Sequence, residues 1–384
     1  MMQRSIQAVW VTLLAIASVA CEASVVGGGS GAERSVDLGT PGAGGSAGGG
    51  GMGGTGGIGG TGGGIIEECD DAGHCLEILA TGLNSPDAIA VDSANVYWTS
   101  FFDNTVMKCA VTGCGGAPTV LASGQPHPKV IALDDTSVYW GTLGNPGGDG
   151  SVMKCGLEGC AGAPESLLTN VNVGDIAVQN AQLYLTEITP QPGGAGLLLR
   201  CPTSGCANTP IELAQVQGVP SGLAVSGTKL VWGAIAIAME AEVPSTVMTC
   251  DSNACTPAAL ASTSAIHVRH MAMDAVNVYW TNADFSVMKC PLTGCGSQMP
   301  ITMASFDGLD IPHAIATDGV NVYWTVVAMG GTPAVMKCPV GGCENGPITL
   351  AVGPKIQGPA GIAVDATHVY WTDSEAGTVM RTLK

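Results

Sequence analysis

The ionisable side chains best suited to chemistry gather at one recurring place, just ahead of short Ala-x-Asp segments such as Ala90-Val91-Asp92. Histidine and carboxylate could transfer protons there, and arginine and lysine could hold an anion. Other copies of the segment carry glycine, serine or alanine at the same place. A position needed only for folding would carry similar residues in every copy, so we interpret this variation as a candidate ligand site, against the alternative that these side chains only solvate a rim. The residues assigned to it are Asp87, His127, Lys129, Asp175, Arg269, His270 and His313.

Phenylalanine marks the same end of the repeats. All six tyrosines and six of the seven tryptophans occupy one recurring strand, which makes them core residues. The four phenylalanines lie elsewhere: Phe101, Phe102 and Phe285 in loops that follow this strand, and Phe306 in a loop that enters another. Aromatic rings at loop tips favour contact with a partner or an apolar ligand, and the alternative is that they cap the core. We add Phe101, Phe102 and Phe285 to the candidate ligand-binding residues.

The elements that must position these residues repeat seven times. The recurring strand has its second residue at positions 97, 139, 184, 231, 279, 323 and 370, so the copies are 42 to 48 residues apart. A period of this length with several short strands per copy is typical of a β-propeller with one blade per repeat. The copies read Val96-Tyr97-Trp98-Thr99, Val138-Tyr139-Trp140-Gly141, Leu183-Tyr184-Leu185-Thr186, Leu230-Val231-Trp232-Gly233, Val278-Tyr279-Trp280-Thr281, Val322-Tyr323-Trp324-Thr325 and Val369-Tyr370-Trp371-Thr372.

The two ends of the repeat array predict how the ring closes. Residues 75–80 resemble an outer strand with no inner strands before them, and residues 379–382 resemble a third strand with no outer partner. Pairing the two would leave no open edge between the first and last blades. We therefore predict an all-β, seven-bladed propeller of four antiparallel strands per blade, with the N-terminal strand closing the last blade. The propeller is assigned to residues 67–384.

Fourteen of the fifteen cysteines form close pairs, one pair per repeat. A metal site would need further ligands and no histidine recurs beside the pairs, while a redox site would use Cys-x-x-Cys once. Seven local pairs in an exported chain predict structural disulfides. The predicted pairs are Cys69 with Cys75, Cys109 with Cys114, Cys155 with Cys160, Cys201 with Cys206, Cys250 with Cys255, Cys290 with Cys295, and Cys338 with Cys343.

The N-terminal residues predict export. Residues 1–20 join a short basic start to an apolar run and the small residues Ser18-Val19-Ala20, as in a signal peptide. Cys21 then stands where a bacterial lipoprotein would be lipidated, although Ser18 occupies a position where leucine is usual, so ordinary cleavage after Ala20 is the alternative. Residues 21–66 are rich in glycine and predict a disordered tether. We expect the cell envelope, either the outer membrane or the periplasm and cell surface, with the lipid as the only contact with a membrane.

The whole repeat array resembles the YWTD and NHL superfamily of propellers. Tyr370-Trp371-Thr372-Asp373 matches the full tetrapeptide, and the other copies match it in part. The receptor YWTD propellers have six blades, against seven here. Members of the superfamily bind proteins, bind small molecules or catalyse, so the resemblance implies a fold without choosing a function. Seven-bladed relatives similar to streptogramin lyase imply an enzyme alternative, in which His270 or His313 is a general base and Arg269 steadies an anion.

Our functional expectation is a lipid-anchored binding module that uses the channel-mouth face, with an unknown protein, glycan or small molecule as ligand. The alternatives are a lyase- or lactonase-like enzyme and a structural envelope protein. The formal charge of −18 argues against nucleic acid as a partner. We expect a monomer with no cofactor. We also expect no metal, because two carboxylates in a loop are usually just solvated. Calcium bound at Asp70-Asp71 or at Asp307 and Asp310 is the alternative.

Overall fold

The computed structural model describes residues 66–69, 75–144, 149–189, 196–235, 245–262, 267–295, 299–306 and 310–384. The chain divides into two compact units, 1–61 and 62–384, and every described residue belongs to the second. The predicted signal peptide, the proposed lipidation site Cys21, the glycine-rich segment before β1 and the carboxylates Asp70, Asp71 and Asp307 lie outside the described residues. Within the described part of the chain, no helix has the length and apolar character to cross a bilayer.

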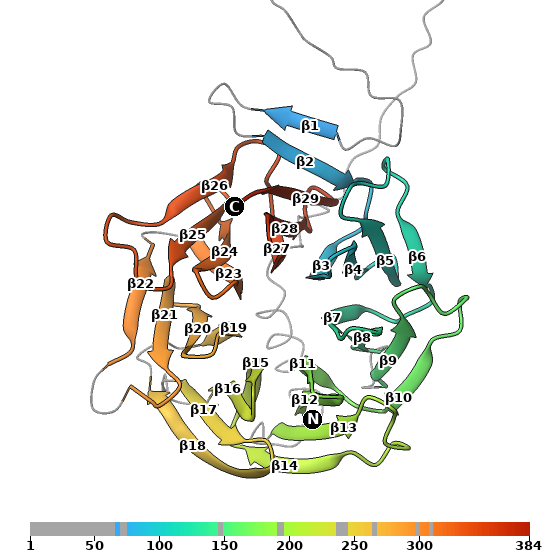
Figure 1. The fold of residues 1–384 in the computed structure, drawn as a ribbon, viewed down its shortest axis with the longest axis vertical. Coiled ribbons are helices and arrows are strands. Elements are labelled where there is room, and N and C mark those ends of the chain that lie inside the picture. The colour runs from blue at the N-terminus through green and yellow to red at the C-terminus, as the bar shows by residue number, and fades with distance from the viewer. Residues whose placement is uncertain are drawn as a thin grey trace, which may run out of the picture. The chain divides into compact units, whose positions relative to one another are not determined.

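Seven antiparallel sheets form the second unit, arranged radially about a central axis (Figure 1). In six of them the four strands follow chain order from the inner strand to the outer strand, as the repeats predict. Blade 1 contains β3 (Pro86–Val91), β4 (Asn95–Ser100), β5 (Thr105–Ala110) and β6 (Thr119–Ala122). Blade 2 contains β7 (Pro128–Leu133), β8 (Ser137–Thr142), β9 (Ser151–Gly156) and β10 (Glu165–Thr169). Blade 3 contains β11 (Val173–Gln179), β12 (Gln182–Ile188), β13 (Gly196–Pro202) and β14 (Ile211–Val216).

Blades 4 to 6 repeat this order. Blade 4 contains β15 (Val219–Ser226), β16 (Lys229–Ile235), β17 (Thr246–Asp251) and β18 (Ala254–Ser262). Blade 5 contains β19 (Val268–Met273), β20 (Asn277–Asn282), β21 (Ser286–Pro291) and β22 (Ile301–Ser305). Blade 6 contains β23 (Asp310–Thr317), β24 (Asn321–Ala328), β25 (Ala334–Pro339) and β26 (Ile348–Val352).

The seventh blade joins the two ends of the repeat array. It contains β27 (Pro359–Val364), β28 (His368–Asp373) and β29 (Thr378–Leu383) from the C-terminus, and β2 (Cys75–Ala80) pairs with β29. This confirms the predicted closure. An additional strand, β1 (Ile66–Cys69), pairs with β2 outside it, so this blade has five strands where we predicted four. Cys69 lies opposite Cys75 in that pairing, and their disulfide holds the hairpin.

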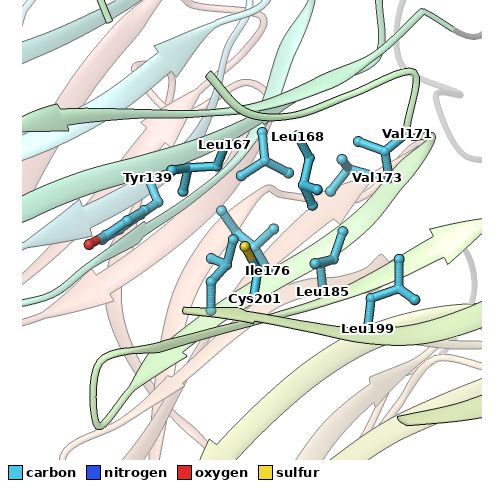
Figure 2. Close-up of a cluster of buried hydrophobic side chains, with 11 residues drawn as sticks. Tyr139, Leu167, Leu168, Val171, Val173, Ile176, Leu185, Leu199 and Cys201 are labelled. Carbon is cyan, nitrogen blue, oxygen red and sulfur yellow. The ribbon is translucent and has the colours of Figure 1, made fainter. Parts of the chain in front are cut away.

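The tyrosine-tryptophan strand is the core of each blade. In β4 the four residues Val96, Tyr97, Trp98 and Thr99 are fully buried, because neighbouring blades cover both faces of the strand. The apolar clusters accordingly span blade junctions. Figure 2 shows one of them, in which Tyr139 of blade 2 packs with Ile176, Leu185 and Cys201 of blade 3.

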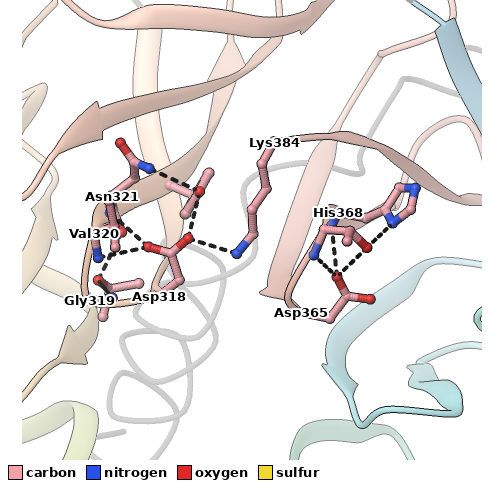
Figure 3. A network of polar contacts seen from close by, with 10 residues as sticks. Asp318, Gly319, Val320, Asn321, Asp365, His368 and Lys384 are labelled. Atoms are coloured by element: carbon pink, nitrogen blue, oxygen red, sulfur yellow. Dashed lines mark hydrogen bonds and ion pairs between the residues drawn. The ribbon is translucent and has the colours of Figure 1, made fainter.

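The Ala-x-Asp segments end in a hydrogen-bonded turn. In blade 6, one carboxylate oxygen of Asp318 accepts the backbone N–H groups of Val320 (2.9 Å) and Asn321 (2.7 Å), and the other accepts the Tyr323 hydroxyl (2.9 Å) and the Lys384 ammonium (2.7 Å) (Figure 3). The aspartate–tyrosine bond recurs in blades 1, 2, 5 and 7. Blades 3 and 4 have Gln179 and Ser226 instead.

Basic residues of the third strand link neighbouring blades. Among the described residues, five blades have a basic side chain here that donates to a backbone carbonyl of the next blade, so these five residues belong to the framework. The bonds join Lys108 to Leu157 (2.6 Å), Lys154 to Thr203 (2.8 Å), Arg200 to Ser252 (3.0 Å), Lys289 to Val340 (2.7 Å) and Arg381 to Val111.

All seven predicted disulfides are present, one in each blade. The bond of blade 7 joins β1 to β2, and each of the other six joins cysteines five residues apart across the turn between the third and fourth strands. The structure thus confirms every predicted pair. The bonds of blades 1 to 6 join Cys109 to Cys114, Cys155 to Cys160, Cys201 to Cys206, Cys250 to Cys255, Cys290 to Cys295, and Cys338 to Cys343.

The two cysteines of each of these six bonds differ in exposure. The first is buried near the end of the third strand, whereas the second lies in or just after the following turn and is only partly buried. In blade 1, Cys109 belongs to an apolar cluster and Cys114 packs against that cluster from its edge. Each disulfide therefore ties an outer turn to the core of its blade. The partly buried members are Cys114, Cys160, Cys206, Cys255, Cys295 and Cys343.

Candidate functional site

Each inner strand carries a β-bulge near its first residues, where it has one residue more than the second strand that it faces. A bulge re-aims the side chains next to it and is common beside functional sites. Six predicted site residues lie in these bulges, and we call them the mouth residues. They are Asp87 in β3, Lys129 in β7, Asp175 in β11, Arg269 and His270 in β19, and His313 in β23.

Threonine at the end of the Tyr-Trp signature holds the bulges and joins the blades. The Thr325 hydroxyl accepts the Ala314 N–H (3.0 Å) of its own blade and donates to the Ala360 carbonyl (2.9 Å) of the next. The equivalent bonds connect blade 5 to 6 through Thr281 and blade 7 to 1 through Thr372. Each of these threonines satisfies a bulged N–H group, so the mouth residues rest on a hydrogen-bonded backbone.

Two blades replace this threonine by glycine, and the structure explains both. A Cβ atom on Gly141 would lie 2.8 Å from side-chain atoms of Val130 and Val173. A Cβ atom on Gly233 would lie 2.5 Å from the Ser221 hydroxyl oxygen. Inner-strand atoms of the same and the next blade therefore occupy the space that threonine fills elsewhere.

The positive charge of Lys129 acts on groups from four blades. It lowers the pKa of Asp87, Asp175, His270 and His313, in each case as a smaller influence than burial. Its charge therefore acts on mouth residues on several sides of the ring. The ring thus brings together residues that are far apart in the sequence, from position 87 to position 313.

The two mouth carboxylates differ in their partners. Burial raises the pKa of Asp87, and the charge of Lys129 opposes that rise. Asp175 accepts the N–H groups of Ile176 and, from the next blade, Leu223, both at 2.8 Å. Burial nevertheless raises the pKa of Asp175 to about 6. Asp175 therefore joins blades 3 and 4 in addition to facing the mouth.

The two mouth histidines lie side by side with ring centroids 4.7 Å apart. Nδ1 of His270 lies 3.0 Å from the His313 carbonyl oxygen, and since a carbonyl only accepts, Nδ1 carries the proton and Nε2 is the acceptor. Burial, reinforced by the charge of Arg269, lowers the pKa of His270 to about 4. Burial also lowers the pKa of His313 well below its usual value, so both rings are neutral at pH 7.

Buried polar atoms without a hydrogen-bond partner occur in this cluster. Among the described residues they include Nε of Arg269. The His313 ring, by contrast, interacts with the Ala360 backbone, which opposes the lowering of its pKa by burial. Burial lowers the pKa of the Arg269 guanidinium. Unpartnered buried nitrogens also occur in the blade cores, among them Nε1 of Trp98, Trp280 and Trp371, so this feature is not specific to the mouth.

His127, Phe101 and Phe102 form a separate aromatic cluster. The His127 ring lies 4.8 Å from the Phe101 ring and 6.5 Å from the Phe102 ring, and its Nδ1 contacts the Gly144 carbonyl at 3.0 Å. Phe102 is half exposed, at 50%. His127 lies in the loop just before β7, outside the bulge, so it is placed beside the mouth residues and not among them.

Phe285 lies in blade 5, in the loop between β20 and β21. Its backbone has a positive φ of 67°, and its carbonyl accepts the Phe306 N–H at 2.9 Å. It takes part in none of the ring contacts found among the described residues, so the structure does not bring it to the Phe101 cluster.

Sequence reasoning found the mouth residues but missed the bulges. Their signal was present: proline stands at or immediately before the bulge in five blades, and proline within sheets is confined to strand starts, edges and bulges. These prolines are Pro86, Pro128, Pro220, Pro312 and Pro359.

A hollow of about 460 Å³ lies between the outer strand β10 of blade 2 and the β13–β14 connection of blade 3, lined by Glu165, Ser166, Ser204 and neighbouring residues. It contains none of the mouth residues, and the ionisable cluster of the bulges is the stronger candidate site. Among the described residues, no group of three or more His, Cys, Asp or Glu side chains is close enough to hold a metal ion.

Comparison with known proteins gives no match to a family model and none to a curated protein. Solved structures do match. The Dos1 propeller has a TM-score of 0.54 at 10% identity, covering 83% of this chain and 82% of that chain. The computationally designed Ika8 protein has a TM-score of 0.52 at 14% identity, covering 80% and 98%. A gluconolactonase from Xanthomonas campestris has a TM-score of 0.49 at 12% identity, covering 81% and 89%.

Identities this low establish the fold alone. The protein is a seven-bladed β-propeller, which is the fold that the resemblance to YWTD and NHL propellers implied. The likeness to the gluconolactonase is too slight to bear on activity.

Proposed function

We propose that this protein is an exported, lipid-anchored binding module that holds its ligand at the channel-mouth face. The observation that carries the proposal is the cluster of ionisable mouth residues in the inner-strand bulges, in which the rings of His270 and His313 lie 4.7 Å apart. The rest of each blade follows a common framework of four strands and one disulfide, and most blades add threonine or basic side-chain links to the next blade. Differences between blades are concentrated at the mouth, as expected where binding requires particular side chains.

Catalysis is the second candidate, and His270 is the residue that favours it. Its Nδ1–H is held by the His313 carbonyl, which leaves Nε2 as a basic nitrogen of fixed orientation. A general base works best with a pKa near the working pH, and burial lowers the pKa of His270 to about 4. A neutral imidazole of such low basicity is better suited to accepting a hydrogen bond from a ligand than to removing a proton, so we place binding first.

The experiment is recovery of ligand by the purified full chain. Wild-type protein, the double variant Lys129→Met/Arg269→Met and the control Lys229→Met would each be incubated with small-molecule, glycan and protein fractions of cell extract. Native mass spectrometry then measures what stays bound. Lys229 is exposed at the opposite end of its inner hairpin, so its loss removes a charge without touching the mouth.

We expect the wild type and Lys229→Met to retain the same species and the double variant to retain at least about tenfold less. Equal retention by all three proteins would move the site away from the mouth. No retention by the wild type would favour the structural alternative. A retained compound that is chemically altered by the wild type and unaltered by His270→Ala/His313→Ala would favour the enzyme.

The lipid anchor rests on the sequence before residue 22 and has its own test. In a bacterial host, the wild type is expected to take up labelled fatty acid and to sediment with membranes. Cys21→Ser is expected to do neither while remaining exported. Equal partitioning of the two proteins would contradict lipidation at Cys21.

A further inference from the structure

The outer edge of a blade can accept a further strand, and blade 7 shows how. In that blade β1 pairs antiparallel with the outer strand β2. The outer strand of blade 2, β10, pairs among the described strands only with β9. Its other edge is therefore open, and an open edge presents backbone N–H and C=O groups to any chain that can pair with them.

Two hollows follow this open edge. The hollow of about 460 Å³ is lined by the whole of β10 and by the turn of blade 3 that contains Ser204 and Asn208. A second hollow, of about 280 Å³, continues from Leu168 past the end of the strand and reaches Glu187. Both are lined by Leu168, Thr169 and Asn208, so together they form one groove along the strand, which we call the β10 groove.

Asn208 shows that the backbone of β10 bonds toward this groove. Its side-chain Oδ1 accepts the Thr169 N–H at 2.9 Å. A side chain of the next blade thus meets a backbone donor of the edge, in the place where a paired strand would offer a carbonyl. Asn208 has a positive φ of 59°, which asparagine tolerates better than most residues. The rest of the edge borders the hollow.

The β10 groove carries negative charge. Its described lining includes the carboxylates of Glu165 and Glu187 and contains no lysine, arginine or histidine. Lys154 lies opposite Glu165 on β9, but its ammonium group donates to the Thr203 carbonyl (2.8 Å). Burial raises the pKa of Glu187, so a cation bound beside it would stabilise the ionised form. Charge complementarity therefore favours a cationic occupant.

We propose that the β10 groove binds an extended, positively charged segment of a partner protein, which adds to β10 as an antiparallel fifth strand in the way that β1 adds to β2. Backbone hydrogen bonds supply the affinity, and lysine or arginine side chains that meet Glu165 and Glu187 supply the specificity. The groove contains none of the mouth residues, so this site does not depend on the proposed function of the mouth.

The experiment measures peptide binding to the purified full chain by fluorescence anisotropy. The probe is the dye-labelled peptide Lys-Val-Thr-Val-Lys, in which β-branched residues favour an extended backbone. One counterpart, Glu-Val-Thr-Val-Glu, reverses the charge. The other is the lysine peptide with both valines N-methylated, which keeps the charge and removes two backbone donors. The protein variants are Glu165→Lys and the matched control Glu344→Lys, an exposed glutamate in the β25–β26 connection of blade 6.

We expect the wild type and Glu344→Lys to bind the lysine peptide saturably and with the same affinity. Glu165→Lys is expected to bind it about tenfold more weakly, and the wild type is expected to bind each counterpart peptide at least about tenfold more weakly. Absence of saturable binding below about 1 mM would overturn the proposal. Equal affinity for the lysine peptide and its N-methylated form would show attraction by charge without strand addition, and equal affinity of Glu165→Lys and the wild type would place the peptide elsewhere; either result also overturns it.

Discussion

The threonine links between blades make a quantitative prediction. In Thr325→Val, a methyl group replaces the hydroxyl at nearly constant volume, so no cavity opens. The change removes the bonds to the Ala314 N–H (3.0 Å) and the Ala360 carbonyl (2.9 Å). Thr325 is fully buried, so both backbone groups lose their partner away from water.

A buried donor or acceptor left unpaired costs about 1–3 kcal/mol. Two such groups predict a loss of about 2–6 kcal/mol in the free energy of unfolding. Folding itself should survive, because blades 2 and 4 already have Gly141 and Gly233 in place of threonine.

The assay is the urea unfolding midpoint at pH 7 with the disulfides intact, and the matched control is Thr349→Val. Thr349 is an exposed residue of β26, where the same substitution removes no buried bond and valine suits a strand. If the two variants unfold within about 0.5 kcal/mol of each other, which is the usual range for surface substitutions, the blade-linking role of threonine is wrong.

Two further predictions concern the ring closure and the mouth. Arg381→Met should lower the free energy of unfolding by about 3 kcal/mol, because it leaves Glu77 without its partner (2.8 Å) and removes the bond from blade 7 to blade 1. Urea unfolding measures this loss against the exposed control Lys229→Met. Equal unfolding midpoints of the two variants would contradict the prediction. Burial raises the pKa of Asp175 to about 6 from 3.8, so the native state holds an extra proton between pH 4 and 6 and loses stability as the pH rises through that window. Asp175→Asn should therefore become more stable relative to the wild type as the pH rises from 4 to 6, by about 2 kcal/mol, and parallel stability curves for the two proteins would refute the raised pKa.

The fold was predictable because its information is local and repeated. The strand signature, its spacing and the close cysteine pairs each report on one hairpin, and seven copies agree. The closure by residues 75–80 was predictable from an unpaired strand at each end of the array. The extra strand β1 was not, since residues 66–69 belong to no repeat and only the pairing of Cys69 with Cys75 reveals their place.

The candidate site was predictable only as a set of positions. Variation at two adjacent repeat positions picked out the mouth residues, with Asp87, Lys129, Arg269 and His313 at the first position and Asp175 and His270 at the second. The sequence could not say which of their side chains have partners. That depends on neighbours from other blades: Leu223 for Asp175, and the carbonyl of His313 for His270.

Burial and charge at the mouth are likewise properties of the closed ring. Burial raises the pKa of Asp175 to about 6 and lowers the pKa of His270 to about 4. This desolvation acts only after the seven inner strands surround the two side chains. Phe285 makes the same point, since it follows the same recurring strand as Phe101 and yet lies in blade 5, apart from that cluster. The repeated chain specifies each blade through local contacts, whereas the distances between blades, and so the chemistry of the mouth, exist only once the ring is closed.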